Sequence, residues 1–122
     1  MTTMQPEIDS LVERARKAQQ NYEATGTQEK FDRAAQAAAW ALMEPTRNAE
    51  LAAFAVAETG LGNSADKITK NHRKTLGLLR DIKGQKSFGL VDDNPASGVS
   101  EFLRPKGVVA AIVPSTNPLA TP

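Results

Sequence analysis

The chain has 122 residues, so it can hold one modest helical core and leaves much of its surface exposed. Its 15 Lys and Arg residues nearly balance 14 Asp and Glu residues, and the net charge of +1 gives no global field that favours nucleic acid or an anionic membrane. The absence of cysteine excludes disulfides, cysteine zinc sites and a thiol nucleophile within this sequence. With no signal segment and no apolar run near ~20 residues, we expect a cytoplasmic protein that uses no membrane.

The first part of the chain has the apolar period of helices. Residues 6–24 place Ile8, Leu11 and Val12 on one face, and Gly26 offers a stop. Thr27 can then cap a second helix, in which alanines permit close packing between helices.

A third and a fourth helix follow. Pro45 restarts the helical pattern and Gly60 ends it, after which Ser64 can cap a helix that stops at Gly84. The apolar stripe of this fourth helix is predicted to be Ile68, His72, Leu76, Leu79 and Ile82. Large apolar side chains from all four helices are expected in one core: Ile8, Leu11, Phe31, Trp40, Leu51, Phe54, Leu76 and Leu79.

Beyond Gly84 the pattern becomes that of β-structure. Residues 87–91 and 99–103 are short β-prone runs separated by a polar loop, which predicts a hairpin. Residues 108–113 form a continuous apolar run typical of a strand that is covered on both faces in a parallel sheet. Such a strand needs neighbours, so we expect its partners to come from residues after Pro122 or from another molecule.

Two motifs carry a family resemblance. Pro105-Lys-Gly-Val-Val-Ala-Ala-Ile-Val-Pro-Ser-Thr-Asn-Pro118 resembles the start of the cofactor domain in the aldehyde dehydrogenase superfamily, whose usual form is Pro-Trp-Asn-Phe-Pro. Its Ser-Thr-Asn-Pro version is closer to the coenzyme A-acylating branch. Glu58-Thr-Gly-Leu-Gly62, followed by Asp66-Lys67 and Lys70-Asn71, resembles a second stretch of that branch. The chain is thereby identified as an N-terminal fragment of an enzyme of the acetaldehyde or sulfoacetaldehyde dehydrogenase type.

The resemblance implies an α/β aldehyde dehydrogenase-like parent. In it, residues 1–84 are an N-terminal helical layer, 85–105 a β-hairpin oligomerisation arm, and 106–122 the first strand of a Rossmann-type sheet that begins a truncated NAD(P)-binding domain. The implied reaction converts a small aldehyde, coenzyme A and NAD or NADP to acyl-CoA and the reduced nucleotide. A homo-oligomer formed through the 85–105 arm is expected, and no nucleic acid partner.

The resemblance also assigns candidate residues in the last loop. Asn117 is expected to stabilise the oxyanion that forms when cysteine adds to the aldehyde, although alignment without gaps places Thr116 at that position. The same Asn-Pro pair can simply shape a turn. Ile112, Val113, Pro114 and Ser115 match positions that line the cofactor, and the apolar ones also suit ordinary sheet core. The nucleophilic cysteine would lie outside this chain, so the fragment alone should be inactive.

Other polar residues have simpler interpretations. His72 is the only histidine; its place on the apolar stripe favours packing over catalysis, and no metal ligands are spaced around it. The cations Lys67, Lys70, Arg73 and Lys74 can bind phosphate, but a solvated helix face is the preferred interpretation. Gly60 and Gly62 follow a helix instead of a strand, so they do not form a phosphate loop. The competing function is a non-enzymatic helical interaction module.

Overall fold

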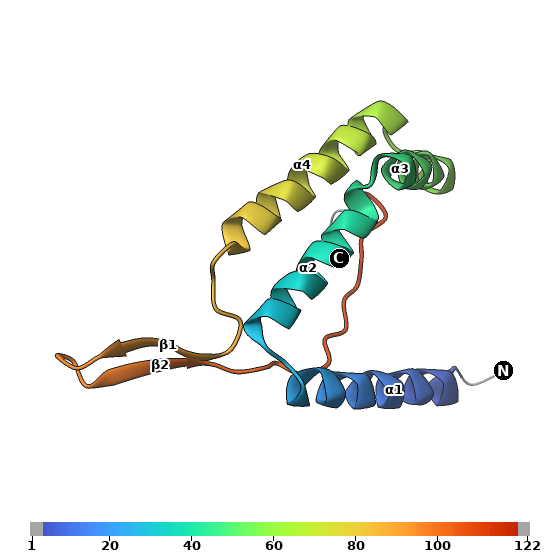
Figure 1. The fold of residues 1–122 in the computed structure, drawn as a ribbon. Coiled ribbons are helices and arrows are strands. Elements are labelled where there is room, and N and C mark those ends of the chain that lie inside the picture. The colour runs from blue at the N-terminus through green and yellow to red at the C-terminus, as the bar shows by residue number, and fades with distance from the viewer. Residues whose placement is uncertain (1–3, 120–122) are drawn as a thin grey trace. The chain divides into compact units, whose positions relative to one another are not determined.

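The computed structural model describes residues 4–119, which form four helices followed by one antiparallel pair of strands (Figure 1). The helices are α1 (Gln5–Ala24), α2 (Gln28–Met43), α3 (Pro45–Thr59) and α4 (Ser64–Ile82); the strands are β1 (Gly89–Asn94) and β2 (Val99–Leu103). The predicted mainly helical segment with a hairpin is therefore confirmed. The described residues divide into two units, 4–31 with 86–110 and 32–85 with 111–119. The domain limits at residues 84 and 105 of the parent stay a prediction.

The ends of α3 follow from local chemistry. The Glu44 carboxylate accepts hydrogen bonds from the backbone N–H groups of Thr46, at 3.1 Å, and Arg47, at 2.8 Å, and so caps the helix start. These bonds, that of Arg47 first, lower the pKa of Glu44. Gly60 ends the helix in the left-handed region at φ 65°, where a side chain would be strained.

The start of α4 differs from the predicted one by a single residue. Asn63, and not Ser64, is the cap: its Oδ1 accepts from the backbone N–H of Asp66 at 2.9 Å, and its Nδ2 donates to the Asp66 carboxylate at 2.6 Å. Both residue types favour this position, so propensity alone could not choose between them.

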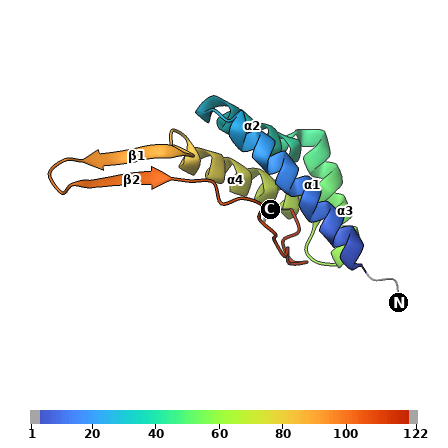
Figure 2. The same cartoon turned by 90° about the horizontal axis from the view of Figure 1, so that it is seen from below.

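The core of the second unit lies where α3 packs against α4 (Figure 2). Ala52 and Ala55 are the buried apolar residues there, and their small side chains allow the two backbones to approach. Asn48 and Asn71 are buried beside them: Asn71 Nδ2 donates to Asn48 Oδ1 at 2.9 Å, and Asn48 Nδ2 donates to the Ile68 carbonyl at 3.0 Å. A satisfied polar pair therefore joins the helices.

The predicted core of large apolar side chains is largely wrong for the described chain. Five of those eight side chains are exposed: Ile8, Leu11, Trp40, Phe54 and Leu76. Phe31, Leu51 and Leu79 are only partly buried. The physical reason is that alanines and asparagines fill the contact between α3 and α4, which leaves the larger side chains on faces that no described element covers.

The predicted stripe of α4 is also shifted. His72 and Leu76 are exposed, so the packed position expected for His72 is wrong within the described residues. The covered face instead runs through Lys67, Asn71 and Thr75. The hydrogen bond between Asn48 and Asn71 fixes this rotation of α4, because it requires Asn71 to face α3.

The first unit has a small aromatic cluster. Phe31 lies edge-on to Tyr22 at 4.8 Å and to Phe88 at 5.3 Å between ring centroids. Gly26 lies under the Phe31 ring: an added Cβ would collide with the ζ carbon of that ring. Gln28 accepts from the backbone N–H of Ser87 at 2.8 Å, which ties the start of α2 to the segment before β1.

The hairpin is confirmed, but its first strand lies further along the chain than the predicted 87–91, because β1 begins at Gly89. β1 continues to Asn94, whose side chain accepts from the backbone N–H groups of Ala96 and Ser97 in the turn. The register shifts between Leu90 and Asp92, which marks a bulge. All five residues of β2 are exposed, so this pair of strands has no covered face among residues 4–119.

Residues 104–113 adopt no regular structure. The strand expected at 108–113 is therefore not formed in the described chain, because a strand requires a hydrogen-bonded neighbour and the described sheet contains only β1 and β2. Ile112 is completely exposed. Whether these residues enter a Rossmann-type sheet in a longer protein stays a prediction.

Candidate functional site

The two motifs that are separated in the sequence meet in the second unit. Lys70, on α4, donates a hydrogen bond from its Nζ to Oδ1 of Asn117 at 2.6 Å. Both side chains are partly buried. A charge-assisted bond of this length fixes the loop against the helix.

This bond also orients the Asn117 amide. An ammonium group has only donors, so the atom that faces Lys70 must be the amide oxygen. The amide Nδ2, with its two donors, is then directed to the other side. A turn in which the Asn117 backbone N–H donates to the Pro114 carbonyl at 3.1 Å holds the residue in place. The side chain is thus oriented as a donor, which is the requirement for stabilising an oxyanion.

A pocket of about 320 Å³ adjoins this bond. It lies at the start of α4 and is lined by Leu61, Gly62, Asn63, Asp66, Lys67, Lys70 and Thr116. Lys67 is only 7% exposed, and its ammonium makes no hydrogen bond or ion pair to the described residues. Thr116, the alternative oxyanion residue, contributes to this pocket, whereas Asn117 is bonded to one of its lysines.

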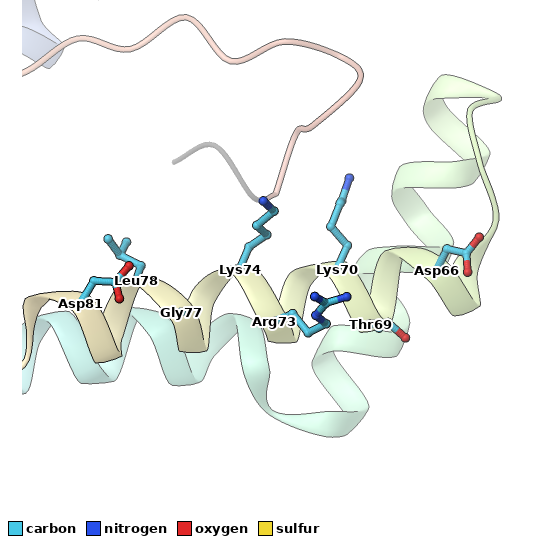
Figure 3. Close-up of a pocket in the computed structure, with 8 residues that line it drawn as sticks. All are labelled: Asp66, Thr69, Lys70, Arg73, Lys74, Gly77, Leu78 and Asp81. Carbon is cyan, nitrogen blue, oxygen red and sulfur yellow. The ribbon is translucent and has the colours of Figure 1, made fainter.

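A second, wider groove follows the side of α4 (Figure 3). Its volume is about 770 Å³, and its lining includes Lys70, Arg73 and Lys74 together with Asp66 and Asp81. Lys70 and Lys74 extend from the same side of the helix in Figure 3. Mixed charges line this groove, which fits the solvated face that the sequence favours.

The residues that the resemblance assigns to the cofactor lie at the surface of the described chain. Ile112, Val113, Pro114 and Ser115 are exposed, so nothing in residues 4–119 covers the positions that the resemblance assigns to the cofactor. Their role stays a prediction. Among the described residues, no group of His, Asp and Glu side chains is arranged to hold a metal ion, and no helix is long and apolar enough to cross a membrane.

Sequence reasoning missed the roles of Lys67 and Lys70, which it grouped with Arg73 and Lys74 as a solvated face. A signal was present, because both lysines lie within the Asp66-Lys67 and Lys70-Asn71 motif, whereas Arg73 and Lys74 lie outside it. Only the fold shows that this motif is adjacent to the last loop.

Comparison with known proteins gives several relatives. The chain is 57% identical over 115 residues to the acylating sulfoacetaldehyde dehydrogenase of Cupriavidus necator, and 46% identical over 117 residues to that of Bilophila wadsworthia. It is 38% identical over 115 residues to the bifunctional aldehyde-alcohol dehydrogenase of Escherichia coli. These alignments include 93–94% of this chain but 23%, 24% and 13% of the three relatives, respectively.

No family model and no solved structure matches the chain. The chain spans about a quarter of the length of the sulfoacetaldehyde dehydrogenases that it matches. For a segment of that extent, the resemblance to the coenzyme A-acylating branch of the aldehyde dehydrogenases, predicted from the two motifs, is confirmed.

Proposed function

We propose that this chain is part of an NAD(P)-dependent, coenzyme A-acylating aldehyde dehydrogenase. The reaction converts an aldehyde, coenzyme A and NAD(P)⁺ to an acyl-CoA, NAD(P)H and a proton. The observation that carries the proposal is the 57% identity, over 94% of the chain, to a relative whose name states an acylating dehydrogenase. The oriented amide of Asn117 supports it.

In this proposal Asn117 acts at the first chemical step. A thiolate adds to the aldehyde carbonyl, and the carbonyl oxygen gains negative charge as the carbon–sulfur bond forms. The Asn117 amide donates to this oxygen, while Lys70 holds the amide in the donating orientation. When bound, NAD(P)⁺ would accept a hydride from the substrate, and coenzyme A would accept the acyl group.

The thiolate has to come from outside these 122 residues, because they include no cysteine. We therefore expect the 122-residue chain to have no dehydrogenase activity by itself.

The substrate that we propose is sulfoacetaldehyde. Three relatives, at 57%, 46% and 40% identity, are named for this substrate, whereas the relatives named for aldehyde-alcohol dehydrogenases are 35–38% identical. We further propose a cytoplasmic homo-oligomer in which the hairpin of β1 and β2 pairs with another subunit. The exposed strands and the apolar side chains Val99 and Phe102 support such pairing.

The test is a steady-state assay of the full-length protein that contains this chain. With sulfoacetaldehyde and NAD⁺ or NADP⁺, reduction of the nucleotide should require coenzyme A, and omission of coenzyme A should end turnover after the acyl-enzyme has formed. Sustained nucleotide reduction without coenzyme A would show a hydrolytic dehydrogenase instead. No reduction with any aldehyde would overturn the proposed function.

A further inference from the structure

Lys67 is a largely buried lysine whose ammonium still reaches the solvent. Its side chain is 7% exposed, and its ammonium has no hydrogen-bond or ion-pair partner among residues 4–119. No side-chain nitrogen of the described residues is both buried and without a hydrogen bond, so the unpaired Lys67 ammonium keeps its contact with solvent. Because Lys67 lines the pocket, its unpaired ammonium is available to an anionic group that enters there.

The other walls of the pocket suit the same kind of ligand. Lys70 lies one helical turn after Lys67 and adds a second ammonium. Thr116 supplies a hydroxyl, and the first turn of α4 adds the positive end of a helix dipole. Gly62 lies beside the Lys67 stem, since an added Cβ would be 3.7 Å from the ε carbon of Lys67.

One carboxylate also borders the pocket. Asp66 accepts one hydrogen bond from the Asn63 side-chain amide, at 2.6 Å, through its Oδ2. Two lysines against this single carboxylate leave a net positive charge on the pocket walls. A singly charged oxoanion would balance that charge.

We propose that this pocket binds an oxoanion group, a sulfonate or a phosphate, between Lys67, Lys70 and Thr116. Its volume of about 320 Å³ lies at the small end of ligand pockets, which fits a compact group on a short carbon chain. Resting on the proposed function, we assign the group to the sulfonate of the aldehyde substrate. Lys70 then connects both ends of the substrate, since it lines this pocket and also holds Asn117.

The geometry of such a substrate fits this assignment. In a sulfonated two-carbon aldehyde, the sulfur is bonded to the carbon next to the carbonyl. The anion and the reacting carbonyl must therefore be bound at adjoining places. The pocket meets this condition, because Thr116 precedes Asn117 in the chain and Lys70 contacts both the pocket and Asn117.

Two measurements on the full-length protein test the inference. The first is calorimetric binding of methanesulfonate and of inorganic phosphate to wild type, Lys67→Met and Lys70→Gln. Loss of a charged hydrogen bond should raise the Kd on the order of 10-fold in both variants. Lys74→Met removes the same charge from the same helix outside the pocket, and its Kd should match wild type.

The second measurement compares KM values. Lys67→Met should raise the KM for sulfoacetaldehyde on the order of 10-fold and leave the KM for acetaldehyde, which has no anionic group, unchanged. A higher KM for coenzyme A instead would assign the pocket to a phosphate of that cosubstrate and overturn the sulfonate assignment. Circular dichroism of each variant reports whether α4 has folded, and Lys70→Gln, at a less buried position, repeats the test if Lys67→Met unfolds.

Several outcomes would refute the oxoanion site itself. Binding that survives in both Lys67→Met and Lys70→Gln, or that weakens equally in Lys74→Met, would show that the pocket does not hold the anion. These binding results require no turnover, so they remain informative if the full-length protein fails as a dehydrogenase. Conversely, dehydrogenase activity with unchanged anion affinity in the variants would refute this inference and leave the proposed function standing.

Discussion

The ammonium of Lys70 lies 2.6 Å from the amide oxygen of Asn117, a residue 47 positions later in the chain. This bond joins the second motif on α4 to the loop that follows the apolar run 108–113. It gives Asn117 a defined donor direction, which an amide on a free loop would lack. The predictions for activity below refer to the full-length protein.

Replacement of Asn117 tests the proposed oxyanion role. Asn117→Ala should lower kcat by about 10²–10³-fold, the usual cost of removing one oxyanion donor. With acetaldehyde as substrate, Thr116→Val should cost much less, because its hydroxyl lines the neighbouring pocket. Ser97→Ala, in the hairpin turn, serves as the unchanged control. A larger loss in Thr116→Val than in Asn117→Ala would favour the alignment without gaps.

Lys70 is expected to act through Asn117 as a positioning residue. Lys70→Met should lower kcat with acetaldehyde on the order of 10-fold, the effect of losing one charged hydrogen bond that holds the donor. The KM for the nucleotide should not change. Lys70→Arg retains a donor and should recover part of the lost kcat. Equal losses in Lys70→Met and Lys70→Arg, with kcat and KM both altered, would indicate a structural defect.

The buried pair Asn48 and Asn71 should stabilise the contact of α3 with α4. Asn71→Leu leaves Asn48 Oδ1 without its donor and should lower the free energy of unfolding by about 1–3 kcal/mol. The double variant Asn48→Leu/Asn71→Leu should lose less unfolding free energy than the sum of the two single variants, because neither side chain of the pair is then left without its partner. Urea unfolding measures each corner of the cycle, and strict additivity would exclude a coupled pair.

The cap of α3 predicts that the stability of the fold depends on pH. Hydrogen bonds from the backbone of Arg47 and Thr46 lower the pKa of Glu44 below its ordinary 4.5. A lowered folded-state pKa stabilises the fold above pH 4.5, and this contribution is lost as the pH falls through the folded-state value. The Tm difference between wild type and Glu44→Ala should therefore shrink on acidification. Glu50→Ala, on the same helix, is the control; a constant difference for Glu44→Ala would contradict the cap.

The hairpin predicts self-association of the protein. Val99 and Phe102 are 60% and 59% exposed on β2, and a neighbouring subunit could cover them by strand pairing. Val99→Lys/Phe102→Lys should shift the oligomer towards smaller species in sedimentation velocity. The control variant Ala96→Lys/Ser97→Lys adds the same charge in the turn and leaves both strands unaltered. Dissociation by the turn variant alone would point to charge instead of strand pairing.

Helix boundaries could be predicted from the sequence because local chemistry sets them. Pro45 and Gly60 bound α3 through backbone geometry that any neighbour would leave unchanged. The rotation of α4 could not be predicted, since apolar periodicity selects Leu76 while a hydrogen bond between Asn48 and Asn71 selects the adjacent face. Single-sequence patterns do not reveal such polar pairs.

The candidate site likewise combines a residue that the sequence predicts with a contact that it does not predict. Asn117 was identified by its motif, but the contact with Lys70 depends on how the last loop returns to α4. The strand at 108–113 depends on partners that a periodicity argument cannot supply. Local signals thus predict where helices and strands lie, whereas the arrangement of the candidate site depends on long-range contacts.

The most direct test of the central claim is mass-spectrometric analysis of the product formed by the full-length protein from sulfoacetaldehyde, coenzyme A and NAD(P)⁺. We predict sulfoacetyl-CoA in an amount equal to the NAD(P)H produced, with both lost together in Asn117→Ala. Free sulfoacetate as the primary product, or acyl-CoA formation at the wild-type rate in Asn117→Ala, would contradict the account.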